Sequence, residues 1–115
     1  MIEHIRPAQL GEWLAHNRSA GLNTPLVLDV REPWEVQLAS VQPDGFELVV
    51  MPMASIPARL NELPRDKPIA CLCHHGGRSA QVALFLHNQG FDPVVNISGG
   101  IHAWSAEVDP SVPRY

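Results

Sequence analysis

The succession of short apolar runs and helical patterns limits what this chain can fold into. Four largely apolar runs, each of three or four residues, lie at positions 26–28, 47–50, 69–72 and 94–97. Short continuous runs of this kind are typical of strands that are buried on both faces, as in parallel sheets. The intervals between them hold helical patterns and turns. We therefore predict an α/β fold with a mostly parallel sheet.

The helix predictions depend on apolar spacing and on residues that favour helix starts. Pro7 and Pro33 stand at the first positions of two predicted helices, where the fixed φ of proline suits the helix. Ser55 is placed to cap a third. Predicted helices cover about residues 7–17, 33–38, 55–60, 79–89 and 101–104, and residues 21–25 are predicted to form a loop.

Size and charge limit the domain count and the partners. The 115 residues suit one domain, 1–115, with an extended tail over 109–115 that we expect on the surface. The net charge of −4 disfavours nucleic acid and anionic membranes as partners. No apolar stretch is long enough to span a bilayer and no leader is recognisable, which predicts a soluble protein. The two cysteines do not suit a disulfide, so we expect a reducing, cytoplasmic setting.

Residues 73–79, Cys-His-His-Gly-Gly-Arg-Ser, link a predicted buried strand to the clearest helix pattern. At a helix start, backbone N–H groups lack intrahelical partners and carry partial positive charge. Gly76 and Gly77 let the loop curl into a ring of N–H donors, and Arg78 adds a cation whose fork suits anions. We therefore expect the thiol of Cys73 to ionise more readily than a free thiol and to act as a nucleophile.

Simpler interpretations of the same residues stand beside this one. Cys73 would otherwise be a buried structural cysteine before an ordinary glycine turn. Cys71 shares a strand face with Cys73 and is predicted to be a small core residue rather than a resolving thiol. These cysteines, with His74 and His75, are metal-ligand types, but one short segment can hardly surround an ion, so no metal site is expected. The two histidine side chains either help to attract an anion or face solvent.

Three motifs, in the right order, resemble the rhodanese family of sulfurtransferases. Cys73-x-x-Gly76-x-Arg78 looks like the active-site loop of that family. Residues 26–35 resemble its strand-to-helix signature, and residues 96–104 resemble its C-terminal Gly-Gly-x-x-x-Trp segment. The resemblance covers most of the chain. It implies a rhodanese-like fold, with a mostly parallel central sheet of about five strands flanked by helices on both faces.

The resemblance also implies a mechanism. Cys73 would attack the outer sulfur of a donor such as thiosulfate, sulfite would leave, and the cysteine would carry a persulfide. A second nucleophile, which is cyanide in an assay and a thiol or a protein cysteine in a cell, would then take the terminal sulfur. No metal or organic cofactor is implied. We assign the anion cradle to the backbone amides of residues that follow the cysteine, namely His74, His75, Gly76, Gly77, Arg78 and Ser79.

Asp29, Arg31 and Glu35 are expected at the same rim, because ligands sit beyond the carboxyl ends of parallel strands. The resemblance implies that they support the active loop, and a surface ion pair is the alternative. Two other functions remain: a non-catalytic rhodanese-like binding or regulatory module, and a phosphatase or arsenate reductase. Only four residues separate Cys73 from Arg78, one fewer than in the phosphatases that resemble rhodaneses, which favours sulfur chemistry.

Overall fold

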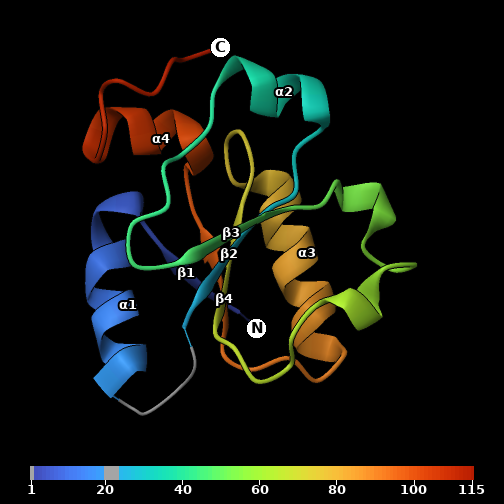
Figure 1. The fold of residues 1–115 in the computed structure, drawn as a ribbon. Coiled ribbons are helices and arrows are strands. Elements are labelled where there is room, and N and C mark those ends of the chain that lie inside the picture. The colour runs from blue at the N-terminus through green and yellow to red at the C-terminus, as the bar shows by residue number, and fades with distance from the viewer. Residues whose placement is uncertain (1, 20–23) are drawn as a thin grey trace.

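A five-stranded sheet, parallel throughout, forms the centre of the structure (Figure 1). The computed structural model describes residues 2–19 and 24–115, so most of the loop predicted at 21–25 lies outside the described residues. The strands run in the spatial order β1-β5-β4-β2-β3. Their bounds are Glu3–Ile5 for β1, Leu26–Asp29 for β2, Glu47–Val50 for β3, Ile69–Leu72 for β4 and Val94–Ile97 for β5.

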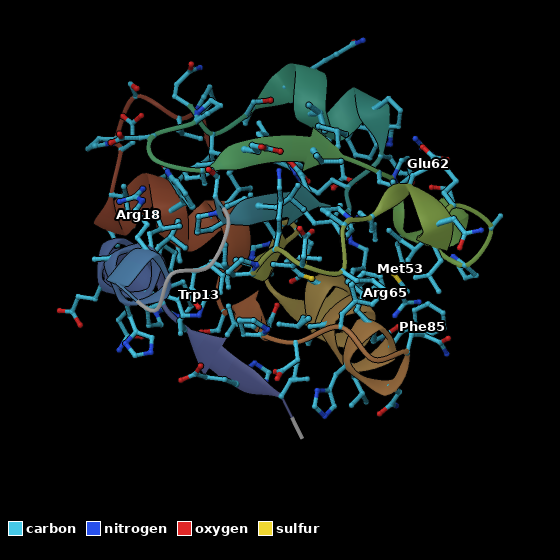
Figure 2. All side chains as sticks on the ribbon, turned by 60° about the horizontal axis from the view of Figure 1, so that its bottom comes forward. Trp13, Arg18, Met53, Glu62, Arg65 and Phe85 are labelled. Atoms are coloured by element: carbon cyan, nitrogen blue, oxygen red, sulfur yellow. The ribbon has the colours of Figure 1, made fainter. Side chains whose placement is uncertain are left out.

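Side chains of the central strands alternate between two hydrophobic cores, one on each face of the sheet. Val27 and Leu72 belong to one core, whereas Leu28 and Cys71 belong to the other. Helices α1 (Leu10–Ser19) and α4 (Gly100–Glu107) cover the first face, and α3 (Gly77–Asn88) covers the second (Figure 1). Trp13 of α1 and Phe85 of α3 mark these two sides in Figure 2. The predicted fold class, with helices on both faces, is confirmed.

The predicted helix starts at the two prolines are confirmed. Pro7 opens a 3-10 turn, η1 (Pro7–Gln9), that leads into α1, and Pro33 opens α2 (Pro33–Leu38). The helix predicted near 55–60 is wrong, because that segment forms two separate 3-10 turns, η2 (Met53–Ser55) and η3 (Leu60–Glu62). The hydroxyl of Ser55 donates to the carbonyl of Pro52 at 2.7 Å, so it does not cap a following helix.

Two end segments also differ from expectation. β1 was not predicted, and it pairs with β5 so that His4 lies opposite Asn96. Most of the C-terminal tail is exposed, as expected, but Val112 is buried in the core next to α4. The hydroxyl of Ser105 donates to the carbonyl of Val112 at 2.7 Å, and this contact folds the tail back onto the domain.

The carboxyl ends of the strands all lie at one edge of the sheet, because the strands are parallel. The loop between β4 and α3 lies at this edge together with α2 and the C-terminal tail (Figure 1). Among the described residues, no helix is both long enough and apolar enough to cross a membrane.

Candidate active site

The segment after β2 and the loop after β4 meet at the carboxyl edge of the sheet. β2 and β4 are neighbouring strands, so the residues beyond their ends lie side by side. Two hydrogen bonds of 2.7 and 2.8 Å join the guanidinium of Arg78 to the carboxylate of Glu35. The expectation that residues 29–35 and 73–79 share one rim is therefore confirmed.

The sulfur of Cys73 lies inside the turn between β4 and α3. The residue is only 1 % exposed. The backbone N–H of Gly76 donates to Sγ at 3.0 Å, and the hydroxyl of Ser79 lies 3.3 Å from it. Within the part of the chain that the structure describes, these are the recorded hydrogen-bond donors on the sulfur. The sequence analysis assigned six backbone amides to the anion cradle. Among the described residues, one amide and one hydroxyl point at Sγ.

Gly76 makes this geometry possible. Its φ of +106° is one that other residues rarely adopt, and a Cβ at this position would lie 3.0 Å from the backbone nitrogen of Gly99. Gly77 has no positive φ and begins α3. Of the two glycines singled out in the sequence, Gly76 is therefore the one that the turn requires.

Ser79 is held by a residue that the sequence analysis did not single out. Its hydroxyl lies 2.6 Å from Oδ1 of Asn96, whose amide nitrogen is 3.3 Å from the carbonyl of Gly76 and 3.0 Å from Nδ1 of His4. The single hydroxyl hydrogen of Ser79 can go to Asn96 or to the sulfur of Cys73. The signal for this residue was in the sequence, because an amide in the middle of a buried strand needs polar partners.

Arg78 does not point its fork at a free anion site. Both of its terminal nitrogens bind Glu35, whose side chain is almost fully buried. The hydrogen bonds from Arg78 are the main cause that lowers the pKa of Glu35 to about 2. The same carboxylate raises the pKa of Arg78 above its ordinary value. Arg78 therefore ties the start of α3 to α2 with a charged, bidentate contact.

Arg31 and Asp29 form a buried ion pair rather than a surface one. Arg31 is fully buried, and its Nη2 binds Oδ2 of Asp29 at 2.7 Å. Its other donors reach the backbone carbonyls of Glu35 and Ala39 and the hydroxyl of Tyr115. Asp29, Arg31 and Glu35 thus belong to one network that contacts the loop through Arg78.

Tyr115 completes this network, and the sequence analysis missed it. Its hydroxyl donates to Oε1 of Glu35 at 3.0 Å, and its ring stacks on that of His74 with centroids 3.8 Å apart and planes 7° apart. The residue is 84 positions from Arg31, and no local pattern in the sequence indicates such a contact. Only the folded tail brings it to the site.

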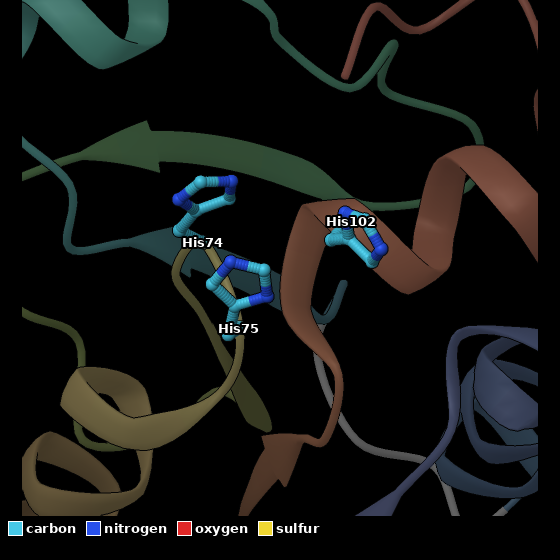
Figure 3. Close-up of side chains that lie close together, drawn as sticks. All are labelled: His74, His75 and His102. Atoms are coloured by element: carbon cyan, nitrogen blue, oxygen red, sulfur yellow. The ribbon is translucent and has the colours of Figure 1, made fainter. Parts of the chain in front are cut away.

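The two loop histidines differ in their surroundings. His74 is half-buried and stacked between Tyr115 and His75, whereas His75 is exposed. Burial lowers the pKa of His74, and the neighbouring His75 lowers it further, so this ring is neutral near pH 7. His102 of α4 is exposed and lies beside both rings (Figure 3).

Cys71 lies below the site, inside the sheet. It is fully buried and shares its core with Cys73, so the prediction of a core residue on the same face is confirmed. Burial raises the pKa of the Cys71 thiol far above its ordinary value. This thiol is therefore not available as a thiolate near neutral pH.

Comparisons with known proteins identify the family of the chain. The family model for the rhodanese-like domain matches residues 10–107. A protein of Allochromatium vinosum named sulfurtransferase is 34% identical over 112 residues, which are 97% of this chain and 96% of that protein. The Arabidopsis thaliana protein named Rhodanese-like/PpiC domain-containing protein 12, chloroplastic, is 45% identical over 93 residues, which are 77% of this chain. The chain spans only 30% of that plant protein.

A solved structure supports the same assignment. The crystal structure of a rhodanese-related protein from Thermoplasma volcanium matches with a TM-score of 0.76 and 33% identity, and it covers 98% of this chain and 99% of that one. The family model covers most of the chain, and the Allochromatium vinosum relative is aligned over nearly its whole length. The chain therefore belongs to the rhodanese-like domain family, and several of its relatives are named sulfurtransferases.

Proposed function

We propose that the protein is a sulfurtransferase of the thiosulfate-using type that carries a sulfane sulfur as a persulfide on Cys73. The donor is thiosulfate or a small persulfide, and the acceptor is a thiol, a protein cysteine or, in an assay, cyanide. The reaction needs no metal or organic cofactor. A reducing compartment such as the cytoplasm keeps Cys73 a free thiol, which agrees with two cysteines that form no disulfide.

The observation that carries the proposal is the N–H of Gly76 on the sulfur of Cys73 at 3.0 Å. A donor fixed in place before the reaction stabilises the anion without any rearrangement of solvent. The Ser79 hydroxyl lies 3.3 Å from the same sulfur and can turn its one hydrogen to it from Oδ1 of Asn96. Both groups are placed to stabilise negative charge on the sulfur during the transfer and on the persulfide after it.

The chemistry consists of two displacements at sulfur. The Cys73 thiolate attacks the outer sulfur of thiosulfate, the S–S bond of the donor breaks, and sulfite leaves with the electron pair. The acceptor then attacks the terminal sulfur of the persulfide, and the Cys73 thiolate leaves in turn. Each step forms one bond to the transferred sulfur and breaks one, so no external oxidant or reductant is required.

The occupied fork of Arg78 argues against phosphoryl chemistry. A phosphatase of this type needs a guanidinium that is free to bind the phosphate oxygens in a bidentate way. Here both terminal nitrogens bind Glu35. The small exposure of Cys73 also favours a slim donor, such as the end of a sulfane chain, over a bulky phosphate ester.

The test is a two-step labelling experiment on the intact protein. After incubation with thiosulfate or a low-molecular-weight persulfide, mass spectrometry should show a gain of one sulfur, roughly 32 Da, on Cys73. Addition of cyanide should remove it and release thiocyanate. Cys73→Ser should abolish both steps. Cys71→Ser is the matched control, because that sulfur is buried two residues away, and it should keep both steps.

Three outcomes would contradict the proposal. If the wild-type protein gains no sulfur from either donor, the remaining interpretation is a non-catalytic binding module. Equal loss in both cysteine variants would show that Cys73 has no special role. Hydrolysis of an aryl phosphate without sulfur transfer would indicate a phosphatase.

A further inference from the structure

Three imidazole rings meet at the outer rim of the candidate active site. His74 and His75 come from the loop after β4, and His102 comes from the first turns of α4 (Figure 3). One ring nitrogen from each lies within 4.8 Å of the other two. The ring centroids of His75 and His102 are 5.0 Å apart, and those of His74 and His75 are 4.0 Å apart. Residues from two separate segments thus form one cluster.

Backbone contacts hold the two segments in place. The N–H of Ile101 donates to the carbonyl of Cys73 at 2.9 Å, and the N–H of His102 donates to the carbonyl of His74 at 3.1 Å. Gly100 allows this approach, since a Cβ there would overlap the carbonyl oxygens of Cys73 and His74. The backbones of the histidines are therefore fixed relative to one another, and only side-chain torsions have to change when a ligand binds.

One nitrogen in the cluster has no partner. Nε2 of His74 is buried and makes no hydrogen bond. A buried polar atom without a partner destabilises the fold, so its position calls for an explanation. Tyr115 stacks on one face of this ring and His75 on the other, which restricts the ring from turning towards another partner. A metal ion binds the nitrogen lone pair of a neutral imidazole, and the stacking holds Nε2 of His74 in a fixed position for such a bond.

We propose that His74, His75 and His102 form a binding site for a divalent first-row transition-metal ion of the Zn²⁺ type. Imidazole nitrogen is a preferred ligand of these ions, whereas Mg²⁺ and Ca²⁺ prefer oxygen. Zinc ligands are drawn from two chain segments, and α4 supplies the second segment that the loop alone lacked. Three protein ligands leave a fourth position for water or an external anion.

His74 and His75 are stacked with their planes 29° apart, so the exposed ring of His75 has to turn off the stack for the two lone pairs to converge on one ion. Zn–N distances of about 2.0–2.1 Å in tetrahedral geometry place ligand nitrogens roughly 3.3 Å apart. The nitrogens here are within 4.8 Å of one another, and His75 and His102 are exposed and able to rotate. The expectation of no metal site, which considered the cysteines and one segment only, is replaced by this proposal.

The test uses the full chain, freed of metal with a chelator and titrated with Zn²⁺ alone. Calorimetry should give one site per chain, and His102→Gln should weaken it by roughly tenfold or more, since even outer partners of metal ligands are worth 10–100-fold. His87→Gln is the matched control, because it alters an exposed histidine in the last turn of α3, at the helix end away from the loop, and it should bind as the wild type does. Ring-nitrogen NMR should show Zn²⁺-dependent shifts at His74, His75 and His102 and none at His4, His16 and His87.

Cys73→Ala separates this inference from the proposed function. If the three histidines are the ligands, this variant binds Zn²⁺ with wild-type affinity although it accepts no sulfur. Loss of binding in Cys73→Ala would assign the ion to the thiolate and overturn the proposal. Wild-type affinity in a folded His102→Gln, checked by circular dichroism, or shifts spread over all six histidines, would also overturn it.

Discussion

Removal of the carboxylate of Glu35 should destabilise the domain, and the structure gives the size of the effect. Oε1 and Oε2 each accept a hydrogen bond from Arg78, the hydroxyl of Tyr115 donates to Oε1, and the N–H of Glu32 donates to Oε2. In Glu35→Gln, one acceptor oxygen becomes an NH₂ group that faces these donors. The substitution preserves shape but removes the charge and at least one hydrogen bond.

The magnitude follows from the pKa of Glu35. The contacts lower this pKa from 4.5 to about 2, and each pH unit corresponds to 1.36 kcal/mol, so ionised Glu35 stabilises the fold by up to about 3 kcal/mol. Because the folded-state pKa lies below the unfolded one, the stabilisation is complete above about pH 5. It is lost as the pH falls from 4.5 through 2, where the unfolded chain binds the extra proton. Glu35→Gln should thus be less stable at pH 7 and converge with the wild type in acid.

Urea unfolding followed by tryptophan fluorescence measures this difference. With a slope of about 1–3 kcal/mol per molar urea, the midpoint at pH 7 should fall by roughly 1–3 M. Glu62→Gln is the matched control, because Glu62 also accepts two hydrogen bonds from an arginine, Arg59, but is exposed. Its midpoint should not change measurably. Equal midpoints for wild type and Glu35→Gln at pH 7, or a gap that persists at pH 2, would refute this account of the network.

Three further predictions concern single sites. Gly100→Ala should destabilise the fold by at least about 1–2 kcal/mol in the same urea assay, because its φ of +59° disfavours a side chain and a Cβ would overlap the loop. Gly11→Ala in α1 is the contrasting variant. It has open space around it and should stabilise the fold by roughly 0.5–1 kcal/mol. Tyr115→Leu should speed hydrogen exchange of the Gly76 amide and slow persulfide formation, since the ring packs His74 and binds Glu35; unchanged exchange would remove the tail from the site. Cys71→Ser should lower the free energy of unfolding by about 1–3 kcal/mol, because it buries a hydroxyl in an apolar core, and unfolding at the wild-type midpoint would contradict that burial cost.

Local sequence patterns predict those strands and helices whose own residues carry the apolar run or the helix start. The four predicted strands are all present. The three inner ones, β2, β4 and β5, are buried along their whole length, whereas β3 lies at the edge of the sheet and is only partly buried. β1 escaped prediction because only Ile5 of its three residues is buried, so the segment carries no apolar run. It forms because β5 offers an open edge, and that information is not local.

The residues of the candidate active site also fall into a group that local sequence patterns predict and a group that only packing brings in. The loop from Cys73 to Ser79 and the segment from Asp29 to Glu35 are recognisable because each follows a strand end, and parallel topology brings strand ends together. Tyr115 and His102 reach the site through the folded tail and the close approach of α4 at Gly100. Their positions depend on packing that no short window of sequence contains.

The fate of Arg78 shows why a correct motif is not yet a mechanism. The sequence analysis assigned the charge and the guanidinium fork of Arg78 to binding of the incoming anion. In the structure the fork binds Glu35, and the groups aimed at the sulfur are an uncharged amide and a hydroxyl. The guanidinium is paired with the carboxylate of Glu35 and is not free to bind the incoming anion, whereas the amide of Gly76 contacts the reacting atom. Arg78→Lys keeps the charge but breaks the bidentate pair. It should therefore lower the urea midpoint of unfolding clearly and change the KM for thiosulfate little.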